Sequence, residues 1–185
     1  MTRTFPAEAY ILCGGKSTRF GSPKARYMLD GTTLIQRLFL LLDGLFEQTT
    51  LVCKREGDYQ DLDLPTIADA YPAYAPLVGL LTALEHSRTE WTFITACDLP
   101  NLSEWLIRWL WDQRNGLGVI PATQDHLHPL TAVYHRSSLT LFSSAYQRKE
   151  YALHPILKIP AFKKVTVPDS SILWNINQLD DLRKE

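Results

Sequence analysis

A glycine-rich, basic loop directly after a short apolar run is the feature that most constrains this chain. The run Ala9–Cys13 predicts a first buried strand, and the segment Leu12–Lys24 then carries three glycines among two lysines and an arginine. Glycine lets the backbone approach a ligand closely, and successive N–H groups in such a loop form a concave anion site. Because α/β proteins bind ligands beyond the carboxyl ends of their strands, the loop predicts a site for nucleotide phosphates.

Two familiar phosphate-binding motifs do not fit this loop. The segment Gly15–Thr18 resembles the end of a P-loop, but that motif requires a glycine where the chain has Tyr10. The dinucleotide fingerprint, started at Gly14, requires glycines in place of Lys16 and Arg19. The loop is therefore a third type, and the alternative is a structural turn with exposed lysines.

The composition of the chain narrows the class of protein. Its 185 residues, 45% of them hydrophobic, predict a single domain over 1–185 with a full core. A net charge of −1 argues against nucleic-acid binding, which usually carries a basic excess, but leaves room for a local basic pocket. The short polar start and the interrupted apolar stretches predict no signal peptide, no membrane span and a cytoplasmic location.

Three cysteines, Cys13, Cys53 and Cys97, each fall at the carboxyl end of a predicted strand. Their odd number and wide spacing argue against a disulfide framework or a zinc site. We expect small, buried, reduced side chains, with a metal-binding or redox trio as the alternative.

Strand and helix patterns alternate along the chain. Strands are expected at Ala9–Cys13, Thr49–Cys53, within Leu64–Asp69, and at Trp91–Cys97, Gly118–Pro121, Leu130–His135, Lys163–Val167 and Ile172–Trp174. Helices are expected from Thr32 or Thr33 to about Phe46, at Leu77–His86, from Ser103 to about Arg114, and at Ser137–Arg148 and Gln178–Lys184. The alternation predicts an α/β fold whose mainly parallel sheet is covered on both faces.

Asp98 directly follows the predicted strand Trp91–Cys97, at the same edge of the sheet as the glycine loop. A carboxylate there is well placed to hold Mg²⁺, which prefers hard oxygen ligands and bridges to substrate phosphates. The alternative is an ordinary loop aspartate or a helix cap.

Two further segments suit contact with a nucleotide. Ala75–Gly79 joins a loop to a helix start, and Asp69 just upstream is able to accept from a base or ribose, unless it is a surface aspartate at a strand end. Asn175 and Asn177 occupy alternate positions of an extended segment, although Asn177 also suits the N-cap of the last helix.

In this order the segments resemble the molybdenum cofactor guanylyltransferases, the MobA-like branch of the nucleotidyltransferases. The matching segments are Leu12–Lys24, Ala75–Gly79, Cys97–Pro100, His128–Tyr134 and Asn175–Leu182. They span nearly the whole chain. The resemblance implies a Rossmann-like three-layer nucleotidyltransferase fold with a mainly parallel, mixed sheet.

The resemblance also implies a reaction, in which GTP gives its GMP part to the terminal phosphate of molybdopterin or of its metal-loaded form and pyrophosphate leaves. Implied catalytic residues are Arg19, Lys24 and Asp98, and Asp98 is the implied ligand of Mg²⁺, or of Mn²⁺ in its place. Implied nucleotide contacts are Leu12, Gly14, Gly15, Lys24, Asp69, Asp98 and Asn177. Proteins that insert the finished cofactor are the implied macromolecular partners.

Departures from the family pattern leave the substrate open. Ala75 and Val78 stand where the family has glycine and alanine, and Gln178 stands where it has threonine. One alternative is a related nucleotidyltransferase that uses CTP or a sugar or alditol phosphate, although Gly14 followed by Gly15 favours the guanylyl branch. Another is a nucleotide-binding protein without turnover, a sensor or carrier. Retention of both Asp98 and Lys24 argues against a binding protein without turnover.

Overall fold

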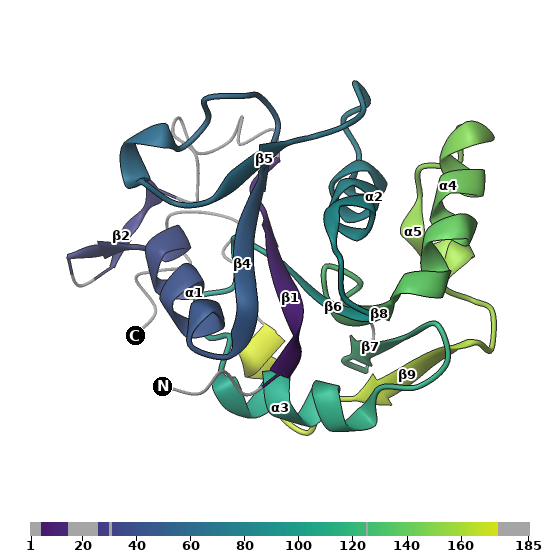
Figure 1. Ribbon diagram of the computed structural model, residues 1–185. Coiled ribbons are helices and arrows are strands. Elements are labelled where there is room, and N and C mark those ends of the chain that lie inside the picture. Colours follow the sequence, from purple (N-terminus) through teal and green to yellow (C-terminus); the bar gives the residue numbers. More distant parts are fainter. Residues whose placement is uncertain (1–4, 15–25, 30, 125, 174–185) are drawn as a thin grey trace.

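A seven-stranded sheet forms the centre of the computed structural model, which describes residues 5–14, 26–29, 31–124 and 126–173 (Figure 1). Across the sheet the strands follow the order β5 (Thr66–Ala68), β4 (Phe46–Cys53), β1 (Phe5–Leu12), β6 (Trp91–Ala96), β8 (Thr131–His135), β7 (Gly118–Ala122) and β9 (Phe162–Thr166). β8 runs antiparallel to its neighbours β6 and β7, and the other pairs in the sheet are parallel.

Helices cover both faces of this sheet (Figure 1). α1 (Leu34–Asp43) and α3 (Glu104–Gln113) pack on one face, and α2 (Pro76–His86), α4 (Leu139–Gln147) and α5 (Leu153–Ile156) pack on the other. Along β1, Ala9 and Ile11 join the first core and Tyr10 and Leu12 the second, because successive side chains of a strand point to opposite faces. The predicted three-layer α/β fold with a mainly parallel, mixed sheet is confirmed. None of the described helices is long and apolar enough to cross a membrane.

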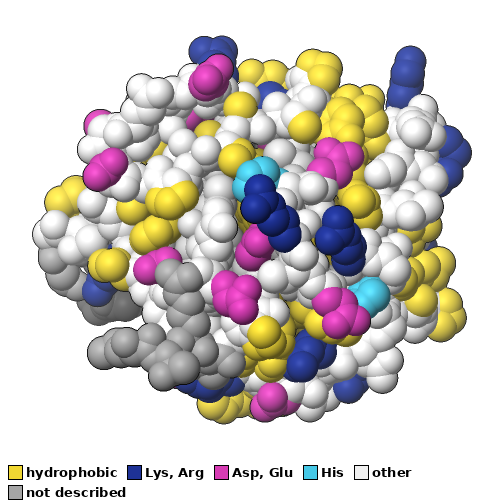
Figure 2. All heavy atoms as spheres, viewed as in Figure 1, with side chains coloured by type: hydrophobic (Ala, Val, Ile, Leu, Met, Phe, Trp, Pro, Cys, Tyr) yellow, Lys and Arg dark blue, Asp and Glu magenta, His cyan; other side chains and the backbone are white. Residues whose placement is uncertain are grey.

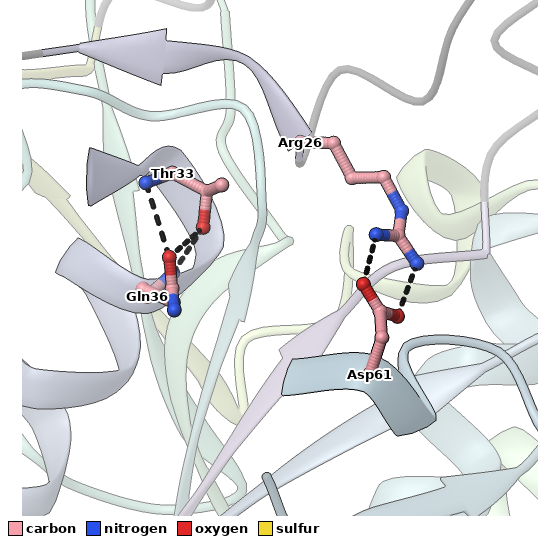
Figure 3. A network of polar contacts seen from close by, with 4 residues as sticks. All are labelled: Arg26, Thr33, Gln36 and Asp61. Atoms are coloured by element: carbon pink, nitrogen blue, oxygen red, sulfur yellow. Dashed lines mark hydrogen bonds and ion pairs between the residues drawn. The ribbon is translucent and has the colours of Figure 1, made fainter. Parts of the chain in front are cut away.

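A short hairpin leads into α1. It consists of β2 (Met28–Leu29) and β3 (Thr32–Thr33), and Thr33 caps the helix as the sequence predicts. Gln36 N–H donates to Thr33 Oγ1 at 3.3 Å, while Gln36 Oε1 accepts from Thr33 N–H at 3.2 Å (Figure 3). This reciprocal capping box satisfies two backbone donors at the helix start. Ahead of the hairpin, Arg26 forms a bidentate ion pair with Asp61 (Figure 3).

Several details of the predicted elements are wrong. β1 and β4 begin at Phe5 and Phe46, ahead of the predicted Ala9 and Thr49. The helix expected to reach Phe46 ends at Asp43, because Gly44 caps it and the Phe46 ring is needed in the core as the first residue of β4. The strand expected at Ile172–Trp174 is instead the 3₁₀ helix η4 (Ser170–Leu173), as far as the residues are described.

Several short elements escaped prediction. They are the β2–β3 hairpin, α5, and the 3₁₀ helices η2 (Gln60–Leu62) and η3 (Arg136–Ser138), the latter joining directly onto α4. The predicted helix Gln178–Lys184 lies outside the described residues.

Two glycines with positive φ differ in the room available for a side chain. Gly116 has φ +57°, and a Cβ there would lie 2.4 Å from the carbonyl oxygen of Ala161; Gly31 has φ +80° with open space around it. We expect Gly116→Ala to lower the free energy of unfolding by about 3 kcal/mol, from strain and clash together. Gly31→Ala carries only the conformational cost of about 1 kcal/mol.

Urea unfolding of the two variants measures this difference. Equal losses of stability in the two variants would contradict the close approach of Gly116 to Ala161.

Candidate active site

The carboxyl ends of three adjacent parallel strands lie level with one another. Leu12 of β1 pairs with Val52 of β4 on one side and with Ala96 of β6 on the other. The pairing continues one step beyond the ladder, since Cys13 N–H donates to Val52 O at 2.8 Å and Cys97 N–H donates to Leu12 O at 3.3 Å. The residues that follow these three strands, Gly14, Lys54 and Asp98, therefore leave the sheet at one edge.

Asp69 joins this edge from the neighbouring strand β5. Its backbone N–H donates to the carbonyl of Cys53 at 2.7 Å, and its side chain is only 6% exposed. Lys54 Nζ donates to Oδ2 of Asp69 at 3.1 Å, whereas the buried Oδ1 has no hydrogen-bond partner among the described residues. Burial raises the pKa of the Asp69 carboxyl, and the ammonium of Lys54 acts in the opposite direction.

An unsatisfied buried carboxylate oxygen costs about 1–3 kcal/mol or more, so its presence needs an explanation. The oxygens of Asp69 lie beside two glycines: a Cβ on Gly14 would be 3.5 Å from Oδ2, and one on Gly79 would be 3.8 Å from Oδ1. The same Cβ on Gly79 would be 3.4 Å from Leu12 Cδ2. Asp69 therefore packs against both glycines, with Oδ2 on the Gly14 side and the unpartnered Oδ1 on the Gly79 side, close to Leu12.

The start of α2 lies at this same place. Ala75 is its N-cap in an extended conformation, Pro76 is the first helical residue, and no side chain caps the first turn. A helix N-terminus whose N–H groups lack a side-chain partner favours a negatively charged or acceptor group nearby. The predicted helix is confirmed, and it begins at Pro76, one residue before the predicted Leu77.

Asp98 lies in the turn directly after β6, with its Oδ1 shielded from solvent. Ser103 caps α3 by accepting from Leu106 N–H at 3.3 Å, so Asp98 is not the cap of that helix. Among the residues that the structure describes, no group of three or more His, Cys, Asp or Glu side chains is arranged to hold a metal ion. Mg²⁺ usually takes one or two protein carboxylates and completes its shell with water and phosphates, so a single hard carboxylate at this edge fits that ion.

The three cysteines lie together below the site, each one residue before a residue of the edge. All are free; Cys53 is buried and the other two are half-buried. Burial, aided by hydrogen bonds with the thiols of Cys53 and Cys97, raises the pKa of the Cys13 thiol well above its usual value. A protonated thiol is a poor nucleophile and a poor metal ligand, so Cys13 serves as packing.

His128 precedes β8, at the far side of the same edge. Its backbone N–H donates to Pro121 O at 2.9 Å, and its buried Nε2 has no hydrogen-bond partner among the described residues. Burial, with a smaller contribution from the nearby His126, lowers the pKa of His128. Burial thus favours the uncharged form of this imidazole.

The sequence-predicted residues thus divide into two groups. Leu12, Gly14, Asp69 and Asp98 are brought to one edge of the sheet, as the strand pattern predicts. The others lie outside the described residues; they are Gly15, Arg19, Lys24 and Asn177.

Lys54 is the residue that the sequence reading missed. Its position directly after a buried strand, like that of Asp98, was the available signal.

Charge on one face of the molecule is mixed. Figure 2 shows acidic and basic side chains interspersed on the face seen in Figure 1, with apolar side chains between them.

Comparison with known proteins gives this arrangement a family. A protein of Flavobacterium johnsoniae named "probable molybdenum cofactor guanylyltransferase" is 32% identical over 179 residues, 94% of this chain and 93% of its own length. A protein of the same name from Aquifex aeolicus is 28% identical over 95% of this chain and 88% of its own.

Among solved structures, molybdopterin-guanine dinucleotide biosynthesis protein A of Archaeoglobus fulgidus superposes with a TM-score of 0.81 at 23% identity, covering 95% of each chain, which supports the fold. Residues 9–162 match the MobA-like NTP transferase domain, a match that includes the ends of β1, β4, β5 and β6. This chain belongs to the MobA-like NTP transferase family.

Proposed function

We propose that this protein is a guanylyltransferase that moves GMP from GTP to the terminal phosphate of molybdopterin or the molybdenum cofactor, with release of pyrophosphate. Family membership and the names of its relatives support this activity. The observation that carries the proposal is the buried carboxylate of Asp69, which packs against Gly14 and Gly79 and whose Oδ1, on the Gly79 side, has no partner among the described residues. A buried acceptor next to two residues without side chains suits a nucleotide that offers hydrogen-bond donors at close range.

The nucleotide lies across the carboxyl edge of the sheet. Leu12 and the two glycines after Cys13 contact the base and ribose, and Asp69 accepts from one of their donors. Arg19 and Lys24 bind the triphosphate, since cations are the groups that offset its charge. Asp98 would hold Mg²⁺, or Mn²⁺ in its place, and Asn177 is a further candidate contact of the nucleotide.

The reaction needs positioning and charge stabilisation more than covalent help. An oxygen of the acceptor phosphate attacks the α-phosphorus of GTP, a new P–O bond forms, and the bond from the α-phosphorus to the bridging oxygen breaks as pyrophosphate leaves. Because the acceptor phosphate is already ionised, no strong general base is required. When bound, Mg²⁺ supplies positive charge to the phosphates, and Arg19 and Lys24 supply the rest.

A nucleotide panel tests the proposed base. In thermal unfolding with Mg²⁺ and one of GTP, CTP, ATP or UTP, we expect GTP to raise the melting temperature most, because a ligand that binds only the folded state stabilises it. Pyrophosphate release that requires both GTP and molybdopterin completes the test. A larger shift with CTP would instead assign a cytidylyltransferase, and binding without release a nucleotide sensor.

Replacing the carboxylate of Asp98 separates catalysis from folding. We expect Asp98→Asn to lower kcat by at least about 100-fold, because a neutral amide is a poor Mg²⁺ ligand and phosphoryl-type transfer depends on charge stabilisation. Lys24→Ala is expected to lose most activity as well. Unfolding free energies close to that of the wild type serve as the control, and a fully active Asp98→Asn enzyme would remove the role given to that carboxylate.

A methyl group added at Gly79 tests the space beside Asp69. Ala at this helical position is favoured over Gly by up to about 1 kcal/mol, and its Cβ meets only ordinary contacts. We therefore expect Gly79→Ala to be as stable as the wild type or more stable, but to bind GTP more weakly, because the methyl narrows the space that the ligand enters. Calorimetric titration and urea unfolding measure the two effects, and unchanged GTP affinity would place the nucleotide elsewhere.

The ionisation of Asp69 is expected to make the affinity for GTP fall at acidic pH. Only the ionised carboxyl accepts through both oxygens, and burial raises its pKa in the free protein. As pH falls through that raised pKa, GTP affinity should therefore decline at a higher pH than for an ordinary aspartate. Asp69→Asn should not show this decline at acidic pH. The ratio of wild-type to Asp69→Asn affinity for GTP, measured from about pH 4 to about pH 8 around the usual range of a carboxyl pKa, therefore reports the titration of Asp69, because the titration of GTP itself affects both proteins equally.

A further inference from the structure

Lys54 lies at the same edge of the sheet as Asp69, and its ammonium group is bound within the protein. Its side chain is 15% exposed, and its Nζ donates to Asp69 Oδ2 at 3.1 Å, to Tyr71 O at 3.1 Å and to Ala73 O at 2.7 Å. The ring of Tyr74 lies over the ammonium at 4.5 Å from its centroid. A lysine ammonium has three N–H donors, so all three are engaged within the protein.

These contacts decide between two roles for Lys54. A lysine that binds triphosphate needs a donor directed at the ligand, and here each donor has an acceptor in the segment 69–74. The carbonyls of Tyr71 and Ala73 fix the course of that segment, and Ala70 N–H donates to Thr82 Oγ1 of α2 at 3.0 Å. The segment between β5 and α2 is thus bonded to Lys54 after β4 and to Thr82 of α2.

We propose that Lys54 is a positioning residue for nucleotide recognition: it holds Asp69 through Oδ2 and thereby leaves Oδ1, on the Gly79 side, as an acceptor for a donor group of the base or ribose. This role rests on the proposed nucleotide site. Lys54 itself touches neither the triphosphate nor the acceptor and acts through Asp69.

The charge of Lys54 is needed as much as its geometry. Removal of one partner from a mostly buried ion pair leaves the other charge uncompensated. The Asp69 carboxyl would then take up a proton more readily, and a protonated carboxyl presents a donor where the nucleotide needs an acceptor. Lys54→Met is therefore expected to weaken nucleotide binding even when the fold survives.

The test compares Lys54→Met, Lys54→Arg, Asp69→Asn and the double variant Lys54→Met/Asp69→Asn. GTP dissociation constants come from calorimetry, and KM and kcat from pyrophosphate release. Lys163→Met is the matched control, since Lys163 is also half-buried and donates to Gln113 Oε1 at 2.8 Å from β9. Urea unfolding of every variant separates loss of fold from loss of binding.

We expect Lys54→Met to raise the dissociation constant and KM for GTP at least about tenfold with kcat changed much less, the pattern of a lost binding interaction. In the Asp69→Asn background the same substitution should change the dissociation constant by less than about twofold, because coupled residues are not additive. Lys54→Arg should be intermediate, since a planar guanidinium keeps the charge but does not reproduce the three radial donors. Lys163→Met should bind GTP like the wild type.

Lys54→Met with wild-type GTP affinity, or effects of Lys54 and Asp69 that simply add, would overturn the positioning role. Should Lys54→Met fail to fold, an unchanged KM in Lys54→Arg overturns the role and a raised KM supports it. Each of these results leaves the guanylyltransferase proposal standing when the wild type releases pyrophosphate from GTP. If the wild type prefers another nucleoside triphosphate, the guanine assignment fails and the same series, run with that nucleotide, decides the role of Lys54. A wild type that binds no nucleoside triphosphate overturns both.

Discussion

The register of three parallel strands determines where everything else in the site lies. Leu12 pairs with Val52 and Ala96, so β4, β1 and β6 end at the same height. Because the side-chain period of a strand is two, a slip of one residue would exchange the faces of each strand and destroy both cores. The apolar packing that maintains this register is therefore also what brings Gly14 and Asp98 to one edge.

Below that edge the side chains are small and apolar in character. Cys13, Cys53 and Cys97 occupy the last level of the three strands, and the buried ring of Tyr59 lies among them. Burial raises the pKa of the Tyr59 hydroxyl, with the thiols contributing in the same direction. Burial thus favours the uncharged form of Cys13 and Tyr59 beneath the site, and the charged residues Lys54 and Asp98 come directly after Cys53 and Cys97.

The edge of the sheet could be predicted from sequence because buried strands that end in a polar residue are visible as patterns. Asp98 was predicted in this way, whereas Asp69 was named because it lies just upstream of Ala75–Gly79. The role of Lys54 could not be, since its acceptors are the carbonyls of Tyr71 and Ala73, 17 and 19 residues further along the chain. Their direction depends on the path of a loop, and backbone carbonyls leave no mark on a sequence pattern. The strand expected at Ile172–Trp174 failed for a related reason, since a short apolar run fits a helical turn equally well.

The ion pair between Lys54 and Asp69 fixes the orientation of the Asp69 carboxylate more than it adds stability. Removing two charges from water carries a desolvation cost that their mutual attraction can fail to repay, so such a pair is weak support for stability. The burial that raises the pKa of Asp69 is part of that cost. The pair nevertheless leaves Oδ1 without a partner, and an apolar pair of the same size would fill the space without that loss. An arrangement that forgoes stability to leave one oriented acceptor on the Gly79 side is what the proposed nucleotide site would require and what a purely structural ion pair would not.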